Sequence, residues 1–374
     1  MTGSLRVVEG SVDVTIVDGA VASGPADGPA YDASGLHVLP GLIDLQVNGA
    51  AGIDLTLEPT RLWEVAAALP RYGVTAFLPT IITSSPAARS VAMETLAAGP
   101  PEGWAGAWPL GLHFEGPMIA PARKGAHPAA WLVPPSAEVV TGWSREAGVT
   151  MVTIAPELRG ALDVISTLVS AGVLVAVGHT EASAEQVAAA VERGARSLTH
   201  LGNAMPAMAA RAPGPVGAGL ADPRLVAGVI ADGHHLHPTT LAAWARALGP
   251  SRLLAVTDCT AALGMPEGPS RLGDQAVVVR KGTVRLEDGT LAGSAASLPE
   301  CLRVLRSATG WSLADVVGCC TTVAADLVGD ASRGRLHTSA RGDLTLVDDD
   351  LEVVATIVGG RLLHGSLGVL EGEG

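Results

Sequence analysis

Four ionisable side chains follow short apolar runs at four separate places in the chain. Glu115, His179, His200 and Asp258 each stand at the end of a run of the kind that forms a buried strand. In a barrel of parallel strands, the carboxyl ends of all strands lie on one face. One histidine in such a place is typically a hydrogen-bonded structural residue. Three such residues together with Asp258 at successive strand ends instead favour a shared catalytic cleft.

The residue types in this cleft suit hydrolysis at a metal. Glu115, His179 and His200 form a set of three protein ligands, and a water would complete an open site. A metal there would lower the pKa of the water and polarise a carbonyl group. Asp258 would take a proton from the water and pass it to a leaving amine. The ligand set favours zinc, with iron, cobalt or manganese as alternatives.

The elements that must position these residues alternate between strand-like and helix-like segments. Eight such units predict an α/β fold with a closed (β/α)8 TIM-type barrel. The open doubly wound sheet is the competing fold, but no G-x-G-x-x-G follows the first strand and no P-loop occurs. Helices are expected over 60–71, 136–147, 162–171 and 184–193. The strands are expected to end near Gln46, Pro79, Glu115, Pro156, His179, His200, Asp232 and Asp258.

Both ends of the chain have a different pattern from the middle. Residues 12–17 and 36–39 read as short strands, separated by Gly, Pro and Asp. The C-terminal segment 343–363 is β-like in the same way. The two ends therefore predict one small β-sandwich domain, formed by 1–40 with 334–374, beside a barrel domain over 41–333.

Composition excludes several classes of function. The formal charge of −13 disfavours nucleic acid as a partner, because binding a polyphosphate needs a basic surface. No apolar run of about 18 residues is present, so no membrane span is expected. The first eight residues lack the pattern of a secretory signal. Four cysteines without metal-site or disulfide spacing are expected to be free thiols, which indicates a reducing cytoplasm.

Several motifs carry a resemblance to a known family. The string LPGLID at 39–44 is similar to the opening motif of the amidohydrolase superfamily. Two longer strings, H-x-E-G-P from 113 and H-x-x-N-A-M-P from 200, are specific to the N-acetylglucosamine-6-phosphate deacetylases of that superfamily. The resemblance covers essentially the whole chain. Further matching strings are KGAH at 124–127, GHT at 178–180, ADGHH at 231–235, VTD at 256–258 and LAGSA at 291–295.

The resemblance implies hydrolysis of N-acetylglucosamine 6-phosphate to glucosamine 6-phosphate and acetate. It assigns Glu115, His179 and His200 to one divalent metal ion per subunit, and Asp258 to the general base and then the general acid. His127 would hold the amide carbonyl or its oxyanion. The positions that match substrate-contacting residues are Ala126, His127, Asn203, Ala204, Arg211, His235, Leu291, Ala292 and Gly293.

The resemblance also implies an oligomer. In this family the arginine at the position of Arg211 often reaches into the neighbouring subunit. We therefore expect a homodimer in which Arg211 contributes to the partner's amino-sugar phosphate site.

Two places depart from common patterns. Many amidohydrolases hold a second metal with His-x-His after the first strand, where this chain has Gln46 and Asn48. Neutral amides are poor ligands for zinc-like ions, so a single tightly held metal is expected. Gly202 replaces a common aromatic residue and could alter the sugar pocket. Cys259 is expected to be a small filler rather than a nucleophile.

Two alternatives to this function stay open. One is a metal-dependent deacetylase of an unphosphorylated N-acetyl sugar or of an N-acyl amino acid. The other is a non-catalytic barrel subunit, which the presence of the ligands and of Asp258 argues against. Chemistry with a carbamylated lysine is disfavoured, because neither Lys124 nor Lys281 lies at a strand end. Arg123 and Lys124 read as solvated loop charges that add positive potential near an anionic substrate.

Overall fold

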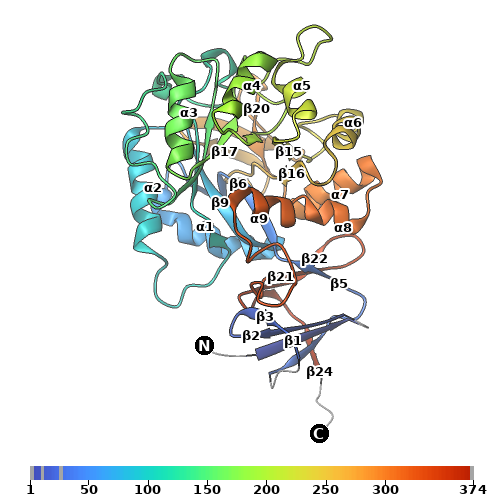
Figure 1. The fold of residues 1–374 in the computed structure, drawn as a ribbon. Helices are drawn as coiled ribbons and strands as arrows, with labels where there is room; N and C mark the ends of the chain where they lie inside the picture. Colours follow the sequence, from blue (N-terminus) through green and yellow to red (C-terminus); the bar gives the residue numbers. More distant parts are fainter. Residues whose placement is uncertain (1–3, 10–11, 25–27, 371–374) are drawn as a thin grey trace.

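The computed structural model describes residues 4–9, 12–24 and 28–370. A large barrel with helices around it lies above a smaller pair of β-sheets, and both ends of the chain enter the smaller part (Figure 1). Residues 1–3, 10–11, 25–27 and 371–374 of the predicted small domain lie outside the described residues. The boundaries proposed at 40/41 and 333/334 stay a prediction.

Eight parallel strands form the barrel, which confirms the predicted fold class. Consecutive strands pair in parallel from β6 through β16. The barrel closes where the backbone N–H of Asn48 donates to the carbonyl of Cys259 at 2.8 Å. The strands are β6 (Leu42–Val47), β9 (Val74–Ile82), β11 (Leu112–Glu115), β12 (Val149–Ile154), β13 (Leu174–Val177), β14 (Ser197–Leu198), β15 (Val226–Ile230) and β16 (Leu253–Val256).

The barrel interior changes from apolar to polar along the strands. Ile43, Leu45 and Leu78 pack with the helix α9 (Thr322–Val328), which covers the amino-terminal end of the strands. Nearer the carboxyl end lies the buried ring of His113, with Nε2 at 2.8 Å from Oγ1 of Thr153. Burial lowers the pKa of His113 to about 4, so the ring is neutral and serves as a packed polar support.

Helices surround the barrel, and several of them begin at a side-chain cap. α4 begins with a capping box in which Ser183 and Gln186 bond each other's backbone. No described helix is long and apolar enough to cross a membrane. The outer helices are α1 (Leu62–Ala68), α2 (Pro86–Ala98), α3 (Ala161–Ser170), α4 (Ala184–Glu192), α5 (Gly214–Ala221), α6 (Pro238–Leu248), α7 (Leu298–Thr309) and α8 (Leu313–Gly318).

The helix expected over 136–147 was wrong. This segment forms consecutive turns between β11 and β12. Gly142 and Gly148 adopt φ values of +81° and +88°, which end any helical path. Val140 and Trp143 of this segment are nevertheless buried in the core.

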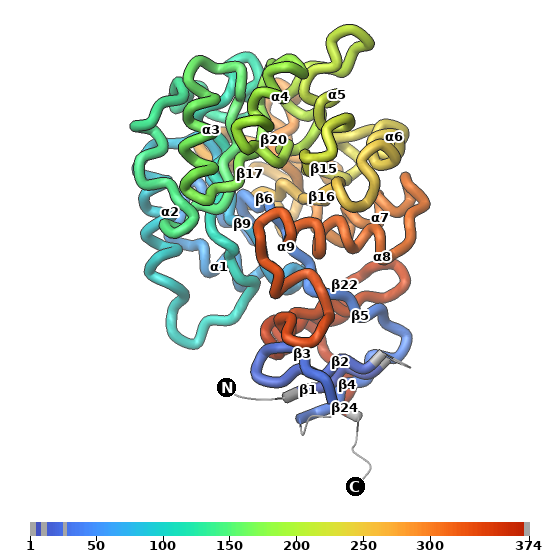
Figure 2. Tube along the Cα trace, viewed as in Figure 1, coloured from blue at the N-terminus to red at the C-terminus, as the bar shows by residue number. Residues whose placement is uncertain are grey.

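The small part is a sandwich of two sheets that both ends of the chain build together. Val7 and Ile16 from one sheet pack against Leu344 and Ile357 from the other. Figure 2 shows the N- and C-terminal segments side by side at this end of the molecule. One sheet has the order β24 (Gly368–Leu370), β4 (Ala30–Asp32), β1 (Ser4–Glu9), β2 (Val12–Val17) and β3 (Ala20–Ala22). The other has the order β23 (Arg361–Gly365), β22 (Val353–Val358), β21 (Leu344–Val347) and β5 (His37–Pro40).

An antiparallel sheet inserted after β16 covers the carboxyl end of the barrel. Leu272 and Ala292 of this sheet pack against Ile82 and Ala126. Its first turn is fixed to the barrel because Asp54 accepts a 2.8 Å hydrogen bond from the backbone of Gly273. The sheet contains β17 (Gly268–Leu272), β18 (Gln275–Arg280), β19 (Thr283–Arg285) and β20 (Leu291–Ser294).

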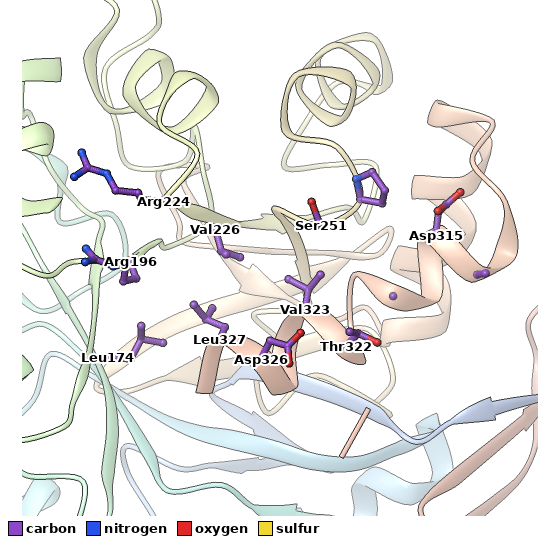
Figure 3. Close-up of a pocket in the computed structure, with 13 residues that line it drawn as sticks. Leu174, Arg196, Arg224, Val226, Ser251, Asp315, Thr322, Val323, Asp326 and Leu327 are labelled. Atoms are coloured by element: carbon purple, nitrogen blue, oxygen red, sulfur yellow. The ribbon is translucent and has the colours of Figure 1, made fainter. Parts of the chain in front are cut away.

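A hollow of about 550 Å³ lies at the amino-terminal end of the strands, between β13, β15 and α9 (Figure 3). Two of its charged side chains already form ion pairs with other residues of the protein. Arg224 pairs with Asp222 at 2.7 Å, and Asp326 pairs with Arg335. This hollow lies at the opposite end of the strands from the four ionisable residues of the predicted site.

Candidate active site

The three predicted metal ligands lie together at the carboxyl end of the barrel. Nε2 of His179 and Nε2 of His200 lie 3.1 Å and 3.0 Å from Oε1 of Glu115. The two Nε2 atoms are 3.1 Å apart, and all three side chains are buried. The polar residues at the ends of β11, β13 and β14 thus point at one spot, as the strand pattern predicted.

The backbone at these positions is strained in a way that serves the site. His179, His200 and Asp258 have φ values of +49°, +31° and +52°. Non-glycine residues rarely adopt such values, and the cost is on the order of 1–3 kcal/mol each. This conformation turns each side chain inward just after its strand ends. The strained residues are therefore the ones whose side chains meet near the barrel axis.

The tautomer of His179 is fixed by the loop that follows β11. Its Nδ1 lies 2.8 Å from the backbone carbonyl of Arg123. A carbonyl can only accept, so Nδ1 carries the proton and Nε2 presents a lone pair toward Glu115 and His200. This arrangement is typical of metal-binding histidines.

The spacing of the three donor atoms fits a divalent metal ion. A tetrahedral ion with ligands at about 2.0–2.1 Å separates its donors by about 3.3 Å. The separations of 3.0–3.1 Å among Oε1 of Glu115 and the two Nε2 atoms are close to that value. Burial opposes ionisation of Glu115, but the neighbouring histidines outweigh it and hold the pKa of Glu115 well below its usual value. The donor set is therefore one carboxylate and two imidazoles.

Asp258 is held beside this cluster by two amides. Its Oδ1 accepts hydrogen bonds from Nε2 of Gln46 at 2.9 Å and from Nδ2 of Asn48 at 2.7 Å. Gln46 also donates to Oε1 of Glu115 at 3.2 Å. Burial and the negative charge of Glu115 raise the pKa of Asp258 to about 6. A carboxylate so placed can accept and return a proton near neutral pH.

His127 lies on the other side of the cluster. Its ring centroid is 4.3 Å from that of His179, and Nε2 is 3.8 Å from Oε2 of Glu115. Nδ1 lies 2.8 Å from Oγ1 of Thr83 and accepts from the backbone N–H of the same residue at 3.4 Å. Burial and the neighbouring His179 keep the pKa of His127 well below its usual value, so the ring is neutral. A neutral ring that accepts at Nδ1 carries its proton on Nε2 and can donate to a carbonyl oxygen.

One cavity of about 490 Å³ joins these residues to the predicted substrate positions. The three ligands, Asp258 and His127 line it. So do the predicted substrate-contacting residues Ala126, Asn203, Ala204, His235, Leu291, Ala292 and Gly293. The roles assigned to these residues stay predictions, but the fold brings them to one place.

Arg211 is the predicted substrate residue that does not line the cavity of its own chain. It lies at the tip of an exposed turn closed by the bridge between Ala209 and Ala212. This turn belongs to the loop that projects from the barrel before α5 (Figure 1). Arg211 therefore lies outside the wall of its own chain's cavity.

Sequence reasoning left several cavity-lining residues out of the predicted substrate site. Arg123 and Lys124 were interpreted as loop charges that add positive potential near an anionic substrate, and both line the cavity. Asp288 and Thr290, from the turn between β19 and β20, line it as well. Their closeness in sequence to the KGAH and LAGSA strings was the signal that could have identified them.

Another missed residue is Asp232, which supports His235 from outside the cavity. Its Oδ2 lies 2.7 Å from Nδ1 of His235, and its Oδ1 accepts from the backbone N–H groups of His234 and His235, both at 2.9 Å. Burial opposes ionisation of Asp232, but the hydrogen bond and charge of His235 outweigh it and lower the pKa of Asp232. The ADGHH string contained this pair, but only the structure shows which atoms meet.

Gly202 and Cys259, two of the departures noted in the sequence, lie beside the cavity rather than in its wall. Gly202 is absent from the described cavity wall, and a side chain there would meet the ring of Trp244 at 2.4 Å. Cys259 is buried, with Sγ at 3.4 Å from the carbonyl oxygen of Gly49. Burial and the charge of Asp44 raise the pKa of the Cys259 thiol well above its usual value. The thiol is thus a packed group rather than a nucleophile.

Comparison with known proteins gives consistent matches. Residues 37–363 match the amidohydrolase family. N-acetylglucosamine-6-phosphate deacetylase of Bacillus subtilis (strain 168) is 36% identical, with 87% of this chain and 84% of the relative covered. The human deacetylase of the same name is 37% identical over 89% and 84% of the two chains. N-acetylgalactosamine-6-phosphate deacetylase of Shewanella sp. (strain ANA-3) is 34% identical over 91% and 86%.

Solved structures agree with these matches. N-acetyl-D-glucosamine-6-phosphate deacetylase of Mycobacterium smegmatis, as a mutant in complex with N-acetyl-D-glucosamine-6-phosphate, superimposes with a TM-score of 0.87 and 32% identity over 97% and 99% of the two chains. The deacetylase of Thermotoga maritima gives a TM-score of 0.86 and 29% identity over 95% of each chain.

Proposed function

Because this chain belongs to the amidohydrolase family and, within it, to the N-acetylglucosamine-6-phosphate deacetylases, we propose that it hydrolyses the acetamide of N-acetylglucosamine 6-phosphate. The products are glucosamine 6-phosphate and acetate. The observation that carries the proposal is the buried cluster of Glu115, His179 and His200, which shares one cavity with Asp258 and His127.

Glu115, His179 and His200 would hold one divalent metal ion. When bound, this ion would polarise the acetyl carbonyl and make a water more acidic. The ligand set favours zinc, with iron, cobalt or manganese as alternatives. Gln46 and Asn48 direct their amide donors at Asp258, which supports a single ion, since donating amide nitrogens do not bind metals.

The protein's own groups account for the proton movements. With Oδ1 of Asp258 occupied by two amides, Oδ2 is the oxygen that takes a proton from water as the water oxygen bonds to the acetyl carbon. His127 donates from Nε2 to the carbonyl oxygen, where negative charge develops. Asp258 then gives the proton to the sugar nitrogen, the carbon–nitrogen bond breaks, and the amine leaves.

Substrate preference separates this proposal from its rivals. The Shewanella relative is named for N-acetylgalactosamine 6-phosphate, and the earlier alternatives include an unphosphorylated N-acetyl sugar or an N-acyl amino acid. The experiment is to compare kcat/KM on both epimeric sugar phosphates, on free N-acetylglucosamine and on an N-acetyl amino acid. The proposal predicts the highest value for N-acetylglucosamine 6-phosphate. A higher value on the galactosamine epimer would reassign the substrate, and equal values on free sugar and phosphate would favour the unphosphorylated one.

We also propose a homodimer in which Arg211 binds the substrate phosphate of the partner. The exposed turn at Ala209–Ala212, away from the chain's own cavity, supports this arrangement. Mixing Arg211→Ala and Asp258→Asn chains tests it. Each mixed dimer would contain one site with both native residues, so an equal mixture should regain about a quarter of the native activity. No regain after verified subunit exchange would contradict the shared site.

A cytoplasmic location is also proposed. All four cysteines, Cys259, Cys301, Cys319 and Cys320, are free and buried, which supports a reducing compartment. The net charge of −13 supports the absence of a nucleic-acid partner.

A further inference from the structure

We propose that Asp232 is a positioning residue that makes His235 a two-donor anchor for the phosphate of the substrate, and so selects phosphorylated sugars. This inference rests on the proposed function and deepens it. Asp232 lies just beyond β15 and does not line the cavity, whereas His235 does. Its effect on the substrate would therefore pass through the histidine ring.

The geometry of the pair leaves one ring nitrogen for the ligand. Nδ1 of His235 lies 2.7 Å from Oδ2 of Asp232, and the two side chains are only 5% and 2% exposed. The other carboxylate oxygen binds two backbone N–H groups of the same turn. Asp232 thus fixes both the turn and the ring, and Nε2 is the ring nitrogen not engaged by this carboxylate.

Charge decides what can bind at that nitrogen. Asp232 is ionised, because its pKa is lowered despite burial, so Nδ1 must carry a proton. A phosphate oxygen at Nε2 is also an acceptor and requires a second proton there. An imidazole between two anionic acceptors is satisfied only with both N–H groups present, and it then carries a positive charge. Charged hydrogen bonds of this kind are stronger than neutral ones.

The cavity has few other cations of its own. Arg123 is paired with Glu181 at 3.3 Å, and Lys124 bonds the carbonyl of Gly125 in its own loop at 3.2 Å. Glu115, Asp258 and Asp288 add carboxylates to the same cavity. A positively charged His235 would offset the negative charge of these carboxylates, which would otherwise repel a dianionic phosphate.

The variant Asp232→Asn separates charge from shape. Asparagine keeps an oxygen to accept the two backbone N–H groups, so the turn is preserved. Its NH2 group would donate to Nδ1, which moves the single proton of a neutral ring to Nε2. The variant therefore retains a donor at the cavity but loses the positive charge.

The test compares native protein and Asp232→Asn on N-acetylglucosamine 6-phosphate and on free N-acetylglucosamine, with metal content checked in both. We expect kcat/KM for the phosphorylated sugar to fall about five- to tenfold, mainly through a higher KM. This factor corresponds to the difference in free energy between a charged and a neutral hydrogen bond. The value for the free sugar should change less than about twofold. An equal fall on both substrates would overturn the inference, because Nε2 would then accept from a sugar hydroxyl common to both. An unchanged value on both would overturn it too.

A double-mutant cycle with His235→Gln shows whether Asp232 acts through His235. Glutamine can donate into the cavity without a carboxylate behind it. In that background, Asp232→Asn should have no further effect on the phosphate substrate. A full additional loss would contradict the inference. Failure of native protein to prefer the phosphate would instead refute the proposed function and this inference with it.

Discussion

Gln46 donates a hydrogen bond of 2.9 Å from its side-chain amide to Oδ1 of Asp258. The same amide nitrogen lies 3.2 Å from Oε1 of Glu115, so it links the proposed base with a proposed metal ligand. This is the position where many amidohydrolases carry a histidine for a second metal. In this chain the amide binds Oδ1 of Asp258, which leaves Oδ2 for the proton transfer that we propose.

Replacing Asp258 by Asn should stop proton transfer without disturbing the metal. We expect kcat to fall by about 10²–10⁴-fold, the usual contribution of a general base. Metal content should stay at the native level, since Asp258 is not one of the three clustered donors. Kinetics and metal analysis on the same preparation check this. A folded variant with a near-native rate would refute the role of Asp258.

Replacing Glu115 by Gln should weaken metal binding itself. The amide lacks the charge that the two histidines face at 3.0–3.1 Å, so the metal should dissociate at a lower chelator concentration. Native protein should hold one ion per chain. Metal analysis after graded chelation measures both quantities. Two tightly held ions per native chain would contradict the single-metal assignment.

The rate should fall on the acid side of neutrality. Asp258 can act as a base only when ionised, and burial with the charge of Glu115 raises its pKa to about 6. A bound divalent cation favours the ionised form, so the acid limb of kcat/KM should be centred at or below about pH 6. A pH–rate profile at saturating metal measures this. A limb centred clearly above pH 6 would contradict it.

Gly202 should matter for stability rather than for the sugar pocket. A Cβ there would approach Trp244 to 2.4 Å, at a φ of +84°. Gly202→Ala should reduce the free energy of unfolding by about 1–3 kcal/mol. Gly310→Ala is the matched control, because Gly310 has a φ of +68° with open space around it. A loss at Gly202 no larger than at Gly310 would show that Trp244 moves aside easily.

The sequence predicted the barrel and its metal cluster because strand ends are marked by apolar runs that stop at a polar residue. Glu115 and His200 were found in this way. The sheet β17–β20 was missed because its strands are short and expose residues such as Val278. Asp232 was missed because its role depends on a 2.7 Å contact to His235, which no spacing rule predicts.

Loops were the least predictable part of the site. Lys124 reaches the cavity because the segment after β11 folds over His179, where the carbonyl of Arg123 fixes the ring. That path depends on tertiary contacts rather than on local preference. The failed helix at 136–147 has the same origin, since its apolar residues are buried from turns.

The measurement that tests the central claim most directly is acetate release from N-acetylglucosamine 6-phosphate, compared with the free sugar, before and after chelation. We predict rapid release from the phosphate, much slower release from the free sugar, loss on chelation and recovery when a divalent metal is returned. Release that survives complete metal removal, or none from the phosphate by metal-loaded protein, would contradict the proposed metal-dependent deacetylase.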